Sequence, residues 1–185
     1  DFCLSRGLGD VYKRQGAMLG VVLSDNFIIL YLFWELTSFS SFLLISFWRE
    51  KKASIYGAQK SLIITVLGGL SMLGGIILLS LATDTFSIQA MISKASDIQN
   101  SPFFILAMIL FMIGAFTKSA QVPFYIWLPD AMEAPTPVSA YLHSATMVKA
   151  GLYLITRITP IFAISEGWVW TCLLYTSPSP RDRQK

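Results

Sequence analysis

The chain has few of the residues on which soluble enzymes depend, and long parts of it carry no charge. Its 185 residues include one histidine and two cysteines, and charged residues make up only 14% of the sequence. Cys3 and Cys172 lie near opposite ends and form no CxxC motif, so we expect neither a disulfide nor a metal site. The sequence also has no phosphate-binding loop, nucleophile triad or heptad seam. It therefore gives no support to a soluble enzyme, and we expect no cofactor.

The two ends of the chain are related through a single DNA string. One string encodes SRGLGDVYKRQ at residues 5–15, and its reverse complement in a shifted frame encodes CLLYTSPSPRD at residues 172–182. Such an inverted repeat resembles a transposase-type sequencing adapter, with an ordinary basic tail as the alternative. We interpret residues 1–15 and 172–185 as translated adapter, expect that they do not pack on the rest of the chain, and exclude them from fold reasoning. Residues 16–171 are then expected to be a fragment of a longer protein.

Without the two ends, the charge of the chain is balanced. The whole sequence has 14 Lys and Arg against 11 Asp and Glu, but residues 16–171 contain eight of each kind. A net charge of zero gives no support to binding of nucleic acid or of an acidic lipid surface. We therefore expect no nucleic-acid partner.

Long apolar stretches predict an all-α fold, a polytopic bundle of transmembrane helices. A helix needs about 20 apolar residues to cross the hydrocarbon core of a bilayer. The first such stretch, residues 26–48, is interrupted only by Glu35. The remaining expected spans are 61–83, 98–117 and 138–162, with residues 16–23 as the end of an earlier helix. Several such stretches in succession exclude the buried core helix of a soluble protein and make the lipid bilayer a partner.

The distribution of basic residues predicts which side of the membrane each loop faces. Residues 49–60 contain four basic residues and one acid, whereas residues 84–101 contain one basic residue and two acids. Because cytoplasmic loops carry an excess of Lys and Arg, we expect 49–60 at the cytoplasm and 84–101 on the opposite side. Gly68, Ser71 and Gly75 share one face of the uncharged helix between these loops, so close helix packing is expected there.

Pro123 is expected to break the third helix, although the chain stays apolar as far as Leu128. Proline has no N–H group, so the carbonyl of Ser119 loses its helical partner. Freed carbonyls at membrane depth are tolerated only beside protein or water, and transporters form ion sites at such breaks. Lys118, just before the break, is therefore a candidate charge carrier. The alternative is an ordinary proline kink with Lys118 at a helix end.

Ionisable residues within apolar sequence form the candidate site. A charge buried in hydrocarbon costs about 3 kcal/mol by insertion scales, so Glu35 is expected to be neutral, paired or hydrated. His143 and Lys149 share the fourth helix about 120° apart and about 9 Å along it, so a proton passing between them needs water or a hydroxyl. Asp130 and Glu133 are candidate proton-uptake groups or solvated loop acids. A structural ion pair for Glu35 and simple packing for His143 are the alternatives.

Four motifs together carry a resemblance to a known family. They are FWELTSFSSFLL (33–44), GAFTKSAQVPF (114–124), WLPDAM (127–132) and PTPVSAYLHSATMVKAG (135–151). The chain resembles the antiporter-like membrane subunits shared by respiratory complex I and the multi-subunit Mrp-type cation/proton antiporters. The EAPTP segment at 133–137, Tyr141 and Lys149 resemble the large A subunit of the Mrp type. Tyr125 departs from the family pattern, which often has histidine there.

The resemblance implies a fold, a site and a function. The fold would be two inverted five-helix repeats, each with a broken helix, and this fragment would be most of the first. Glu35 and Lys118 would form the charge pair of a half-channel, which His143 and Lys149 would continue. The chain would belong to a proton-translocating subunit of a Na+/H+ antiporter in the bacterial inner membrane, with protons, a monovalent cation and other antiporter subunits as partners. The alternatives are a proton-pumping subunit of NADH:quinone oxidoreductase (complex I) and a non-conducting scaffold.

Overall fold

The computed structural model describes residues 2–46, 51–132, 147–163 and 165–176, and all regular elements within these ranges are helices. The predicted all-α class is therefore confirmed. The elements are α1 Phe2–Leu23, α2 Phe27–Ile45, α3 Lys52–Thr83, α4 Ile88–Ser93, α5 Ala95–Gln99, α6 Phe104–Lys118, the 3-10 helix η1 Phe124–Trp127, α7 Leu128–Ala131, α9 Met147–Phe162 and α10 Glu166–Thr176.

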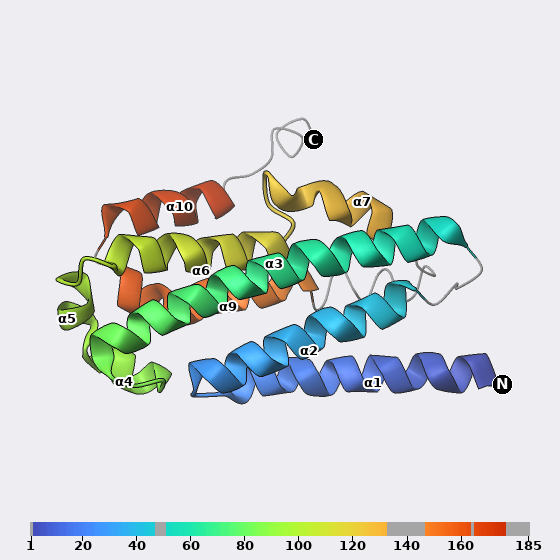
Figure 1. Ribbon diagram of the computed structural model, residues 1–185, viewed down its shortest axis with the longest axis horizontal. Helices are drawn as coiled ribbons and strands as arrows, with labels where there is room; N and C mark the ends of the chain where they lie inside the picture. The colour runs from blue at the N-terminus through green and yellow to red at the C-terminus, as the bar shows by residue number, and fades with distance from the viewer. Residues whose placement is uncertain (1, 47–50, 133–146, 164, 177–185) are drawn as a thin grey trace.

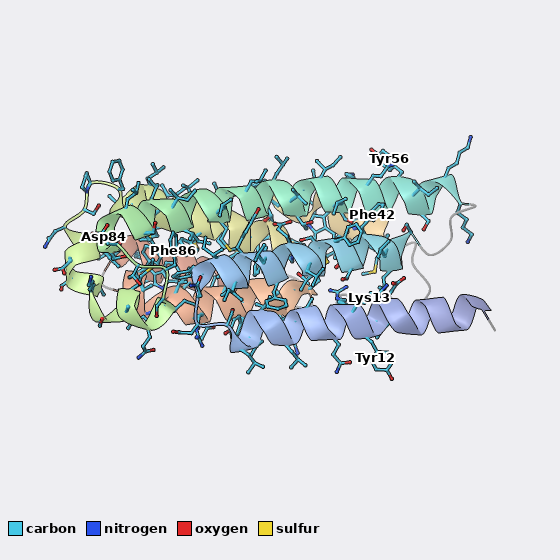
Figure 2. The ribbon with its side chains drawn as sticks, turned by 60° about the horizontal axis from the view of Figure 1, so that its bottom comes forward. Tyr12, Lys13, Phe42, Tyr56, Asp84 and Phe86 are labelled. Carbon is cyan, nitrogen blue, oxygen red and sulfur yellow. The ribbon has the colours of Figure 1, made fainter. Side chains whose placement is uncertain are left out.

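The long helices lie side by side along one axis, with the short helices α4 and α5 at one end (Figure 1). α3 packs against both α2 and α6, α1 packs against α2, and α9 packs against α6. Figure 2 shows Asp84 and Phe86 at one end of the bundle and Tyr56 and Phe42 toward the other. The segments that the basic residues assign to opposite sides of the membrane therefore lie at opposite ends of the bundle.

α2 and α3 are the two helices of the described ranges that are long and apolar enough to cross a membrane, and α6 is a shorter apolar helix. α3 has 32 residues and α6 has 15. Large apolar side chains are exposed along the outer face of α3, at Ile63, Leu67, Leu70, Ile77 and Leu81. This pattern suits a helix that faces hydrocarbon on one side and other helices on the other.

Two predicted helix boundaries are wrong. α3 begins at Lys52, so most of the expected loop 49–60 is helical, because this stretch is rich in good helix formers and has no proline. α6 begins at Phe104 and not at Ile98. Pro102 disfavours helical geometry in the residue before it, so the chain forms the separate short helix α5 and a turn before α6 starts.

Small residues on α3 let α6 approach closely. Gly68 and Gly75 are buried, and a Cβ added at Gly68 would overlap the hydroxyl of Thr117 on α6. A Cβ at Gly75 would lie 2.9 Å from Cδ2 of Phe111. Ser71 Oγ donates a hydrogen bond to a backbone carbonyl of α6 at 3.2 Å. The predicted close-packing face is therefore confirmed.

The described parts of the two excluded ends, residues 2–15 and 172–176, belong to helices that pack on the bundle, so the expectation that they do not pack on it is wrong for these residues. α1 is one continuous helix in which Arg14 and Val21 are both buried. Residues at this spacing share a helix face, and that face packs on α2. Cys172 in α10 is half-buried against the main hydrophobic core. The adapter origin of these residues is a separate statement about their DNA and stays a prediction.

Candidate proton-transfer site

Lys118, the last residue of α6, is completely buried near the middle of the bundle. Its exposed fraction is 0%, which is rare for a lysine. The preceding residue, Thr117, faces Gly68, which lies near the middle of the 32-residue helix α3. The ammonium group at this depth is far from both ends of α3, so it needs partners inside the protein.

The partners of Lys118 come from one turn of α2. Its Nζ donates to the Ser38 hydroxyl at 2.6 Å and to the Trp34 carbonyl at 2.9 Å. The same Nζ lies 4.7 Å from the centre of the Trp34 ring, within range of a cation–π interaction. Trp34 and Ser38 are four residues apart, so they lie on one face of α2 and together hold the ammonium. None of these partners is charged.

Glu35 lies on α2 between these two partners of Lys118 but points to α3. A Cβ added at Gly69 of α3 would overlap Glu35 Oε1. This oxygen is buried and accepts no hydrogen bond from the described residues. A buried oxygen without a donor is destabilised by about 1–3 kcal/mol, which a proton on the carboxyl group or a bound water would relieve.

Glu35 and Lys118 influence each other without direct contact. Their charges interact electrostatically. In the described part of the chain no direct ion pair joins them, because the Lys118 ammonium is turned to Trp34 and Ser38. A contact between Glu35 and Lys118 through one water stays a prediction.

The helix break lies directly behind Lys118. α6 ends there, Ala120 has a positive φ of 52°, and the chain passes Pro123 before η1 begins. The indole N–H of Trp127 in η1 donates to the carbonyl of Thr117 at 2.9 Å. The protein itself therefore supplies a donor to the last turn of the broken helix, as a low-dielectric environment requires.

α9 brings Lys149 near the break but turns it away from Lys118. Ser119 Oγ donates to the carbonyl of Val148 at 3.2 Å, and a Cβ at Gly151 would overlap the same hydroxyl. The residues that follow Lys118 and precede Lys149 are thus in contact. The Lys149 side chain is exposed on the surface of the described part of the chain.

The acidic candidates after the break have different positions. Asp130 in α7 forms an ion pair with Lys60 at 2.6 Å, and the two side chains are 36% and 30% exposed. Glu133 and His143 lie outside the described residues. The described residues contain no group of three or more His, Cys, Asp and Glu that could hold a metal ion.

Sequence reasoning missed Trp34 and Ser38, the two residues that contact the Lys118 ammonium. The signal that could have found them is a cluster of hydroxyl side chains inside an otherwise apolar helix, at Thr37, Ser38, Ser40 and Ser41. All four are buried and bond to backbone carbonyls of α2. Which of these hydroxyls contacts a lysine depends on the helix that packs against α2, and the sequence of α2 does not specify that helix.

The apolar helix bundle, the broken helix and the acid and lysine at its centre define a helical membrane protein. Residues 24–178 match the family described as NADH:quinone oxidoreductase/Mrp antiporter, TM. The match covers most of the chain, and the chain belongs to this family of membrane proteins.

Relatives and solved structures agree with this assignment. The Na(+)/H(+) antiporter subunit A1 of Staphylococcus epidermidis is 98% identical over 174 residues, and that of Staphylococcus aureus strain JH9 is 86% identical. Each alignment covers 92% of this chain, which spans only 22% of the relative. A subunit in the structure of the Mrp complex from Dietzia sp. DQ12-45-1b is 37% identical, with a TM-score of 0.81 over 90% of this chain and 18% of that one.

A second solved structure supports the fold alone. It is the membrane-bound sulfane sulfur reductase, an archaeal respiratory membrane complex, at 24% identity. The TM-score is 0.71, and the alignment covers 85% of this chain and 32% of that one.

Proposed function

We propose that this chain is part of a proton-translocating membrane subunit of a monovalent cation (Na+)/H+ antiporter. In this proposal Lys118 takes up and releases a proton, and Glu35 supplies the negative charge beside it. The observation that carries the proposal is the complete burial of Lys118 at the centre of the bundle, where only neutral groups bond to its ammonium. A lysine in such a place can lose its proton, whereas an arginine stays charged.

Lys149 and His143 would extend the path from Lys118. The contact between Ser119 and Val148 supports this order, because it holds the Lys149 end of α9 next to the break. Lys149 is exposed on a fragment that spans 22% of its relatives. In the complete subunit we expect further helices to cover it, since a lysine facing hydrocarbon would cost several kcal/mol. Asp130 and Glu133 would load protons from the cytoplasmic side.

The relatives' names favour the antiporter over a complex I subunit, which the same family includes. The subunit would cross the bacterial inner membrane several times and assemble with the other subunits of the antiporter. Protons and Na+ or another monovalent cation would be its transported partners.

The test uses the complete antiporter complex in inverted membrane vesicles. Exchange is followed with a pH-sensitive dye after addition of Na+, and assembly is checked on a native gel. We expect Lys118→Ala and Glu35→Gln to reduce exchange to the level of vesicles without the complex. Lys94→Ala is the matched control, because Lys94 donates to the Thr83 carbonyl at one end of the bundle. Normal exchange in assembled Lys118→Ala complexes would refute the proposal.

A further inference from the structure

We propose that the Ser38 hydroxyl is a positioning group for Lys118 and that it hydrogen-bonds with the amine in both protonation states. The inference rests on the proposed function of Lys118 as a proton carrier. It adds a third functional residue, Ser38, to the acid and lysine already described.

The contact between Ser38 and Lys118 is short and buried. The Oγ to Nζ distance is 2.6 Å, shorter than the 2.9 Å from the same Nζ to the Trp34 carbonyl. Ser38 is 1% exposed and Lys118 is 0% exposed. Hydrogen bonds to an ionised group are roughly twice as strong as neutral ones, and burial removes the competition from bulk water.

Glu35 of α2 and Arg14 of α1 act on Lys118 through their charges. The three groups in contact with the ammonium differ in what they can offer a neutral amine. A backbone carbonyl only accepts hydrogen bonds, and the face of an indole ring attracts a cation. A serine hydroxyl both accepts and donates. When Lys118 carries a proton, Ser38 accepts from it, and when the proton has left, Ser38 can rotate and donate to the amine lone pair. Among the α2 groups in contact with Lys118, this property belongs to Ser38.

The alternative partner of the Ser38 hydroxyl is close at hand. Ser38 Oγ also lies 3.3 Å from the Trp34 carbonyl oxygen. This oxygen can accept a hydrogen bond from the Ser38 hydroxyl while Lys118 is charged. By rotating about its C–O bond, the Ser38 hydroxyl can therefore donate to either of two acceptors. One is the Trp34 carbonyl, and the other is the Lys118 amine after Lys118 has lost its proton. A rotation of one hydroxyl needs no movement of the helices.

Ser41 offers a matched control on the same helix. Like Ser38 it is 1% exposed and donates to a carbonyl of the preceding turn, at 2.6 Å from Thr37 O. The Ser41 hydroxyl donates within α2, whereas Ser38 also contacts α6 through Lys118. A comparison of the two serines separates the contact with Lys118 from the general effect of losing a buried hydroxyl.

The experiment measures Na+-driven proton exchange against pH in inverted vesicles that contain the complete complex. We expect Ser38→Ala to shift the pH profile to lower pH by about one unit, because Ser38 bonds more strongly to the charged ammonium than to the neutral amine, so its loss destabilises the charged form more. Ser38→Thr keeps a hydroxyl and should restore the wild-type profile. Ser41→Ala should keep the wild-type profile as well.

The outcomes separate this inference from the proposed function. A wild-type pH profile in Ser38→Ala would overturn the role of Ser38, and so would an equal shift of the profile in Ser41→Ala. In either case inactive Lys118→Ala complexes would still support the proposed function. Normal exchange in Lys118→Ala would overturn the function itself. If Ser38→Ala does not assemble, Ser38→Cys takes its place, since its thiol is similar in size and a weak acceptor. The same shift in Ser38→Cys supports the inference, and an unshifted profile overturns it.

Discussion

Lys60 and Asp130 are 70 residues apart in the sequence, yet Lys60 Nζ lies 2.6 Å from Asp130 Oδ2. The pair joins the first part of α3 to α7, the short helix that follows the break. The two backbones also approach closely, because a Cβ added at Gly57 would overlap the carbonyl oxygen of Asp130. The segment after the broken helix is thus held at the end of the bundle that the basic residues assign to the cytoplasm.

Substitution of the two members of this pair separates proton uptake from simple attachment. Both side chains are about one-third exposed, so solvent screens the pair and it should contribute little to stability. If Asp130 loads protons, Asp130→Asn slows exchange in inverted vesicles, whereas Lys60→Gln leaves the carboxylate in place and exchange close to normal. Equal effects of the two variants on exchange would show that Asp130 acts only as the partner of Lys60.

Gly68→Ala should loosen the contact between α3 and α6. The added methyl group would overlap Thr117, the neighbour of Lys118, and such overpacking costs roughly 1–3 kcal/mol. We expect a lower midpoint in the thermal unfolding of the detergent-solubilised complex. Gly74→Ala is the control, because its Cβ would lie 3.6 Å from the nearest atom, an ordinary contact. Equal midpoints for both variants would speak against close packing at Gly68.

Lys149→Ala should abolish exchange in the complete antiporter while leaving its assembly largely intact. The reason is that a lysine within an apolar helix serves a path for charge, and its removal also removes a desolvation cost. Exchange is measured with the pH-sensitive dye and assembly on a native gel. Leu152→Ala, three residues further along α9 and 43% exposed, is the control. Normal exchange in Lys149→Ala would mean that Lys149 has only a structural role. Loss of assembly in this variant would show that Lys149 holds helices together.

The adapter interpretation makes a prediction about genomic DNA. Amplification and sequencing across both junctions in the source organism should give a reading frame that departs from this chain before residue 16 and after residue 171. The reason is that residues 5–15 and 172–182 can be encoded by one inverted DNA string. A genomic frame that encodes both ends as they stand here would reject the interpretation.

Local patterns in the sequence were sufficient to predict that the chain is helical and to predict one packing face. The uncharged stretch with Gly68, Ser71 and Gly75 at helical spacing predicted the face on which α6 packs, because helical periodicity alone decides which residues share a face. The break before Pro123 followed from the missing N–H of proline. The start of α6 was misplaced because residues 98–103 carry no charge and were counted in the span, whereas the turn at Pro102 separates α5 from α6 there.

The contacts of the site depend on which helices meet, and a single sequence does not contain that information. The resemblance implied that Lys118 and Glu35 form a charge pair, in direct contact or through one water. In the structure the carbonyl of Trp34 and the hydroxyl of Ser38 are nearer to the ammonium, because they lie on the face of α2 that packs toward α6. For the same reason, the sequence did not predict the ion pair between Lys60 and Asp130.

The central claim is that Lys118 carries protons, and the most direct test is the exchange rate of Lys118→Arg. Arginine keeps the positive charge and can still donate to Trp34 and Ser38, but it does not release a proton in proteins. The measurement is the initial rate of Na+-driven proton exchange in inverted vesicles, normalised to the assembled complex on a native gel. The account predicts that assembled Lys118→Arg complexes show no exchange above vesicles without the complex. Exchange at the wild-type rate would contradict it, because a permanent charge would then suffice at this position.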